Sequence, residues 1–117
     1  MGADWARPVV LWGLTARDPE ALADFYRRVA NWEISPGPFM QVSPGLGGPE
    51  PGPGGLILRG DRPGFSLYVQ VADLPASLAL VAELGGRAVT GPIDQPGGAT
   101  FALAEDPEGN PIGLVQQ

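Results

Sequence analysis

The stretch that decides the fold is DPEGNPI at residues 106–112, close to the C-terminal end of the chain. Its Asp, Pro, Gly and Asn residues favour tight turns, because they preset or tolerate the backbone angles of a chain reversal and bond to the local backbone. Apolar residues flank this turn at 99–104 and 111–116. The pattern predicts two strands joined as a hairpin.

A strand and a helix precede this hairpin. Residues 65–71 alternate apolar and polar side chains, which is typical of a strand with one face on a core. Asp73 is a predicted helix N-cap, and the glycine pair at 85–86 is a predicted helix end. A further strand is predicted at 87–90, which gives the element order βαβββ. The apolar stripe predicted for this helix is Leu74, Leu78, Val81 and Leu84.

The first half of the chain has the same order of elements. An apolar run at 8–14 predicts a buried strand, and Asp18 with Pro19 predicts a helix start. Asn31 is the predicted helix end. Short strands are predicted at 32–35, 39–42 and 56–59, between turns rich in Gly and Pro. The predicted apolar stripe of the first helix is Leu22, Phe25, Tyr26 and Val29.

The two halves align with a constant offset, which indicates an internal duplication. Asp18 maps onto Asp73 at an offset of 55 residues. The helix residues Phe25 and Val29 map onto Leu80 and Leu84 at the same offset. The predicted fold class is therefore α+β, with two βαβββ modules at about 8–59 and 65–116. With 117 residues the chain is long enough for one domain, 1–117, and too short for two ordinary ones.

Composition excludes several classes of function. Thirteen acidic and seven basic side chains give a net charge of −6, which repels nucleic acid and anionic lipid. No run approaches the roughly 20 apolar residues of a membrane span, and no signal peptide is recognised, so a cytoplasmic protein is expected. The chain contains neither cysteine nor histidine. Thiol nucleophiles, Ser-His and Cys-His catalytic systems are therefore excluded.

A tract rich in glycine and proline runs from Pro44 to Gly55. It has no Gly-Lys-Ser or Gly-Lys-Thr ending, and the chain has no lysine, so a phosphate-binding loop is disfavoured. A surface connection is the simpler interpretation of this tract. A flap over a ligand site is the alternative.

Three segments together resemble sequences of the vicinal oxygen chelate superfamily. They are the predicted helix segment at 18–26, the Trp-Glu-Ile sequence at 32–34 and the turn at 106–112. The superfamily includes glyoxalases, bleomycin-resistance proteins, extradiol dioxygenases and fosfomycin-resistance enzymes. The resemblance covers the chain from about Pro8 to Gln116. It implies a curved mixed sheet around a cavity, with the helices on the outside, and it implies a homodimer.

Members of this superfamily commonly hold a metal ion through four residues on the first and last strands of the two modules. Those positions map onto Leu11, Ser66, Leu58 and Gly113 in this chain. Three of them offer no donor atom, and a single hydroxyl is a poor ligand for a transition metal. The resemblance therefore implies a member without the usual metal site, and no cofactor is expected.

The remaining cavity positions predict an apolar pocket with a few polar side chains, which suits a flat or hydrophobic organic molecule. Tyr68 is interpreted either as a half-buried strand residue, as a ligand contact or as an acid or base. Trp32, Met40 and Phe101 are interpreted either as core or as ligand contacts. The full set of candidate ligand-binding residues is Leu11, Gly13, Trp32, Met40, Leu58, Ser66, Tyr68, Gln70, Phe101, Gly113 and Val115.

The leading functional hypothesis is metal-free binding of a small hydrophobic or aromatic molecule, an antibiotic or a metabolite, as in the bleomycin-resistance branch. The alternative is a metal-independent isomerase, cyclase or lyase that uses the same cavity, with Tyr68 or a carboxylate as acid or base. A third hypothesis is a module without a ligand, which serves as a dimerisation or partner-binding surface. A filled cavity would favour that third hypothesis.

Overall fold

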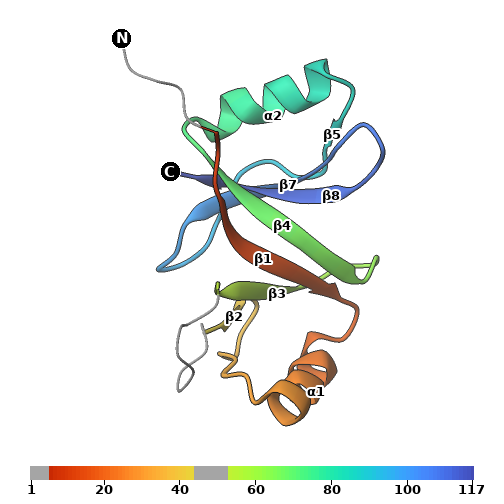
Figure 1. The fold of residues 1–117 in the computed structure, drawn as a ribbon, viewed down its shortest axis with the longest axis vertical. Helices are drawn as coiled ribbons and strands as arrows, with labels where there is room; N and C mark the ends of the chain where they lie inside the picture. The colour runs from red at the N-terminus through yellow and green to blue at the C-terminus, as the bar shows by residue number, and fades with distance from the viewer. Residues whose placement is uncertain (1–5, 44–52) are drawn as a thin grey trace. The chain divides into compact units, whose positions relative to one another are not determined.

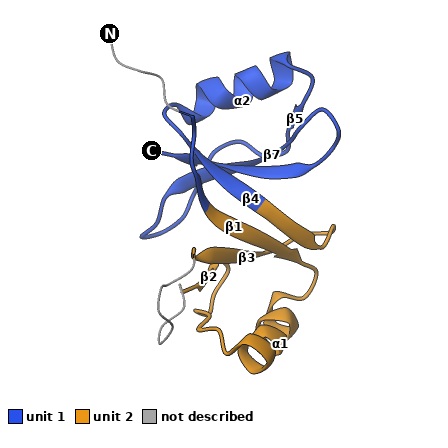
Figure 2. Ribbon diagram, viewed as in Figure 1, with its two compact units in different colours: residues 1–10, 67–117 blue, residues 11–66 orange. Residues whose placement is uncertain are grey.

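The computed structural model describes residues 6–43 and 53–117 of the chain. Most of the predicted surface connection or flap, residues 44–52, lies outside the described residues. The chain divides into two compact units (Figure 2), with residues 1–10 and 67–117 in unit 1 and Leu11–Ser66 in unit 2. None of the helices in the described part of the chain is long and apolar enough to cross a membrane.

Unit 2 packs one helix on one face of a small mixed sheet. Strand β1 runs parallel to β3, and β2 runs antiparallel to β3. The side chains of Leu14, Ile57 and Met40 lie in one row across the three strands and form the core with Ala23 of the helix. The elements (Figure 1) are β1 (Val9–Ala16), α1 (Pro19–Ala30), β2 (Met40–Val42) and β3 (Gly55–Arg59), the first two residues of β1 belonging to unit 1.

Unit 1 repeats this plan with a longer sheet. Strand β4 runs parallel to β8, and β7 pairs antiparallel with β8, β5 and β6. Val71, Ala102 and Leu114 pack against Leu74 and Leu78 of the helix. The predicted α+β class is thus confirmed. The elements are β4 (Gly64–Val71, its first three residues in unit 2), α2 (Leu74–Glu83), β5 (Arg87–Ala88), β6 (Ile93–Asp94), β7 (Thr100–Glu105) and β8 (Pro111–Gln116).

In both units a side chain from the last strand of the module donates a hydrogen bond to the backbone next to the helix start. In unit 2 the Arg59 Nη1 atom donates to the carbonyl of Arg17, just before the helix cap, at 2.7 Å. In unit 1 the Gln116 Nε2 atom donates to the equivalent carbonyl of Ala72 at 2.7 Å, and Gln116 Oε1 accepts from the Leu74 N–H at 2.8 Å. Long side chains at the ends of β3 and β8 therefore satisfy backbone groups next to each helix start.

The predicted helix ends are confirmed. The Asp18 and Asp73 carboxylates accept hydrogen bonds from the N–H groups of Ala21 and Ala76, at 3.1 and 3.0 Å. Asn31 ends α1 in the left-handed conformation with φ of 57°, and Gly85 follows α2 with φ of 95°. Local sequence suffices for these features, because a cap bonds only to the first turn of its own helix.

The predicted turn at 106–110 is organised by one carboxylate. Asp106 Oδ1 accepts from the N–H groups of Glu108 and Asn110, each at 2.9 Å, and Oδ2 accepts from the Asn110 side-chain amide at 2.9 Å. The Asn110 side chain and backbone are the main causes that lower the pKa of Asp106. Gly109 takes a φ of 87°, which a residue with a side chain adopts at a cost.

The predicted apolar stripes of the helices are wrong in part. Phe25 and Val29 are 53% and 68% exposed, and Leu84 is 66% exposed. In α1 the fully buried residue is the small Ala23, which packs in the unit 2 core, whereas Phe25, two positions further along, is half exposed. The prediction selected large apolar residues at helical spacing, and this spacing does not show which of them the sheet covers.

The strand predictions need two corrections. Residues 32–35 do not form a strand, since only an isolated bridge joins Ile34 to Val42. The short strand β6 was not predicted, and its Ile93 pairs with Phe101 of β7. A two-residue strand lacks the length that makes alternation visible in a sequence.

We expect removal of one helix cap to have a measurable effect on stability. Asp73→Ala should lower the free energy of unfolding by about 1 kcal/mol, because the Ala76 N–H loses its acceptor. Asp24→Ala is the matched control, since Asp24 lies on the exposed surface of α1 in an i,i+4 ion pair with Arg28. Urea unfolding of both variants tests the prediction, and equal losses would contradict the capping role.

Candidate functional site

The unit 1 sheet has one face on α2 and a second face that carries five of the eleven predicted site residues. Tyr68 lies opposite Gly113, and Gln70 lies opposite Val115, which in turn pairs with Phe101. Because side chains opposite each other on paired strands share a face, these five residues lie together. Ser66 lies on the same side of β4 by alternation, in the part of this strand that belongs to unit 2. Ser66 and Gln70 are half-buried, whereas Tyr68, Phe101, Gly113 and Val115 are buried.

Tyr68 is the central residue of this face. Its side chain is 2% exposed, and its ring lies so close to Gly113 that a Cβ atom on that glycine would come within 2.5 Å of the ring carbons. The Phe101 ring lies 5.9 Å away between centroids, at a tilt of 48°. Burial raises the pKa of Tyr68 to about 12. The phenol therefore stays protonated near neutral pH and is suited to donate a hydrogen bond rather than to act as a base.

Unit 2 separates the predicted site residues onto two faces of its sheet. Leu11, Gly13 and Leu58 lie on the face opposite the helix, since Trp12, Leu14 and Ile57 face α1. Met40 is opposite Ile57 and is 2% exposed within the helix-side core. The structure therefore gives Met40 a core position, which was one of its two interpretations.

Trp32 also lies on the helix side of unit 2. Its ring stacks on Tyr26 with 4.7 Å between centroids and 14° between planes, and it lies 5.0 Å from the Trp12 ring. Trp12 in turn packs over Gly55 and donates its indole N–H to the Pro53 carbonyl at 3.2 Å. These aromatic contacts stabilise the link between the helix and β1, so Trp32 does not join Leu11, Gly13 and Leu58.

The strand register corrects one of the four positions mapped from metal-binding relatives. Trp12 and Leu67 are 55 residues apart, but their partners Gly55 and Ile112 are 57 apart. The counterpart of Gly113 is therefore Leu56 rather than Leu58. The segment between the first and last strands is two residues longer in the second module, which a constant offset does not capture.

The four mapped positions, with the corrected register, do not supply the ligands of a transition metal. They are Leu11, Ser66, Leu56 and Gly113. Leu11, Leu56 and Gly113 have no donor atom, and the space in front of Gly113 is filled by the Tyr68 ring. Within residues 6–43 and 53–117, no three His, Cys, Asp or Glu side chains cluster in a way that would hold a metal ion. The usual ligand chemistry of the fold is thus not supplied by the residues at these positions.

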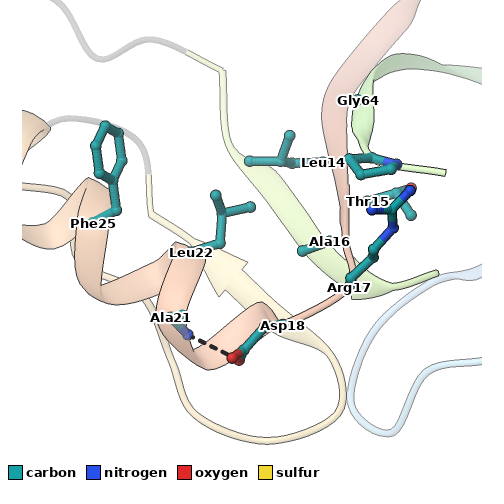
Figure 3. A pocket seen from close by; sticks show the side chains of 10 residues that line it. Leu14, Thr15, Ala16, Arg17, Asp18, Ala21, Leu22, Phe25 and Gly64 are labelled. Carbon is teal, nitrogen blue, oxygen red and sulfur yellow. Dashed lines mark hydrogen bonds between the residues drawn. The ribbon is translucent and has the colours of Figure 1, made fainter. Parts of the chain in front are cut away.

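A groove of about 390 Å³ lies on the helix side of unit 2, and sequence reasoning missed it. Leu14 and Ala16 of β1 form its floor, and Leu22 and Phe25 of α1 form one wall (Figure 3). Pro63 and Gly64 come from a distant part of the sequence, which explains why no local pattern revealed the groove. The remaining lining residues are Thr15, Arg17, Asp18 and Ala21.

The chain belongs to the family of glyoxalase-like domains, whose model matches residues 10–115. This membership confirms the superfamily resemblance found in the sequence. It agrees with the fold, in which each unit pairs the first strand of a module with the last. A comparison with curated proteins found no match.

Solved structures show the same fold at low sequence identity. A hypothetical protein from Bacillus halodurans C-125 is 11% identical, with a TM-score of 0.61 over 97% of this chain and 96% of that one. A methylmalonyl-CoA epimerase in complex with methylmalonyl-CoA and NH4+ is 16% identical, with a TM-score of 0.60 over 95% and 94%. The Mycobacterium tuberculosis epimerase is 15% identical, with a TM-score of 0.57 over 97% and 92%.

We expect Gly113→Ala to lower the free energy of unfolding by about 1 to 3 kcal/mol, because the new methyl group meets the Tyr68 ring. The double variant Gly113→Ala with Tyr68→Leu should show a smaller effect of the alanine, since the ring is gone. Chemical unfolding of the wild type, the two single variants and the double variant measures the coupling energy between the two positions. Strictly additive losses would show that the two residues do not pack together.

The raised pKa of Tyr68 also predicts a loss of stability in alkali. The folded-state pKa of about 12 exceeds the ordinary value of 10.0, so the folded protein holds this proton more tightly. The resulting stabilisation, roughly 2 to 3 kcal/mol, is present below pH 10 and disappears as the pH rises to 12. Unfolding curves of the wild type and Tyr68→Phe across this range test it, because phenylalanine has no proton to lose. Parallel curves would contradict the assigned burial.

Proposed function

We propose that this protein binds a small hydrophobic or aromatic organic molecule without a metal ion. The observation that carries the proposal is the Tyr68 ring on Gly113, which leaves no room for a side chain at a position that the superfamily resemblance maps to a metal ligand. Tyr68 and Gly113 supply no ligand for an ion and are themselves buried, so a flat apolar molecule would reach this face at the half-buried Gln70. The expected homodimer remains a prediction.

Polar groups on this face are few and are suited to orient a ligand. Ser66 and Gln70 are half-buried on β4, beside the buried Tyr68. In the described part of the chain, no buried side-chain nitrogen or oxygen is left without a hydrogen-bond partner. We infer that affinity rests mainly on apolar contact, and that Gln70 selects ligands with a complementary carbonyl or hydroxyl group.

A thermal-shift screen tests this proposal. Aromatic antibiotics, polyketide-like metabolites and divalent metal ions are added separately to purified protein. An organic ligand at 100 times its Kd should add about 2.7 kcal/mol to the free energy of unfolding. Gln70→Leu should weaken the response to a polar aromatic hit, and Asp94→Asn, on β6, is the control. A response to metal ions alone would overturn the proposal.

A metal-independent enzyme is the second candidate, and the structural neighbours favour testing one substrate. Several of them are methylmalonyl-CoA epimerases, so methylmalonyl-CoA belongs in the screen. Exchange of its α-hydrogen with deuterium, followed by NMR, detects epimerisation directly. The protonated state of Tyr68 near neutral pH disfavours this residue as the base. Stoichiometric binding without exchange would favour the binding protein over the enzyme.

A further inference from the structure

The groove on unit 2 combines an apolar interior with a positioned cation. Its floor and walls are aliphatic and aromatic, formed by Leu14, Leu22, Phe25 and Pro63. Phe25 contacts the Tyr26 ring edge-on, with 5.0 Å between centroids, and stays 53% exposed beside this hollow. An apolar ligand gains free energy here by covering that surface.

Arg17 marks one end of the groove. Its Nε atom donates to the Asp61 carbonyl at 3.0 Å, and its own carbonyl accepts from Arg59 Nη1 at 2.7 Å. The loop that contains Asp61 continues into Pro63 and Gly64, and these two residues line the groove. The arginine is therefore held at the groove by the segment that forms its wall (Figure 3).

Arg17 and Asp18, one cation and one carboxylate, both line this end of the groove. The Asp18 carboxylate is engaged as the helix cap through the Ala21 N–H, whereas the Arg17 contacts above use only its Nε atom and its carbonyl. A guanidinium presents paired N–H donors that match the two oxygens of a carboxylate. This arrangement stands out in a chain whose net charge is −6, because most of the surface repels anions.

We propose that this groove binds a small carboxylic acid with an apolar tail, the carboxylate on Arg17 and the tail over Leu14, Leu22 and Phe25. The volume of about 390 Å³ falls in the range of small-molecule sites. The site is distinct from the strand face of Tyr68 and does not depend on the function proposed for that face.

Sodium octanoate is the probe, and octan-1-ol is its uncharged analogue. Titration followed by amide chemical shifts in NMR spectra should move the signals of Ala21, Leu22 and Gly64, which line the groove. Arg17→Gln should weaken octanoate binding by about tenfold, the effect of losing one charge-assisted hydrogen bond. Octan-1-ol should bind more weakly than octanoate to the wild type and equally to both proteins.

Matched variants separate the groove from general charge effects. Arg28→Gln removes the same charge from an exposed position on α1 and should leave the affinity unchanged. Ala21→Leu places a larger side chain at the groove and should weaken binding of both probes. Octanoate shifts that are absent from the groove amides, or equal binding of acid and alcohol to wild type and Arg17→Gln, would overturn the proposal.

Discussion

The parallel pairing of the first and last strands within each module is the constraint on which the rest of the structure depends. Two parallel strands cannot be joined by a tight turn, so the chain between them must cross over, and a helix is part of each crossover. Side chains from the ends of β3 and β8 then bond to the carbonyls of Arg17 and Ala72. Each helix start is thereby held against the last strand of its module.

Close packing of an aromatic ring on a glycine accompanies this pairing in both units. Trp12 covers Gly55 in unit 2, and Tyr68 covers Gly113 in unit 1. The two pairs serve different faces, since Trp12 packs toward α1 whereas Tyr68 lies on the face opposite α2. Glycine is required at both positions for lack of space rather than for backbone freedom. The second pair leaves no room for a side chain at position 113, because the Tyr68 ring fills the space in front of Gly113.

Much of the fold was accessible from local sequence. The caps at Asp18 and Asp73, the left-handed Asn31 and the turn around Asp106 all depend on neighbours within a few residues. The duplication was visible for the same reason, since each module repeats its local signals. Of the candidate site residues, those on β4 and β8 could be grouped by alternation and strand pairing alone. Met40 and Trp32 could not be assigned, because an apolar residue on a short segment suits either face.

The sequence by itself determined the fold class, the helix ends and the lack of histidine, cysteine or a carboxylate at the mapped ligand positions. These follow from residue identity and near neighbours. Only the tertiary structure decided that Leu56 is the counterpart of Gly113, that Phe25 is half exposed, and that Pro63 and Leu22 line one groove. Strand register and the contact between distant segments arise from packing, and packing depends on side-chain size at the closest approach, which periodicity does not record.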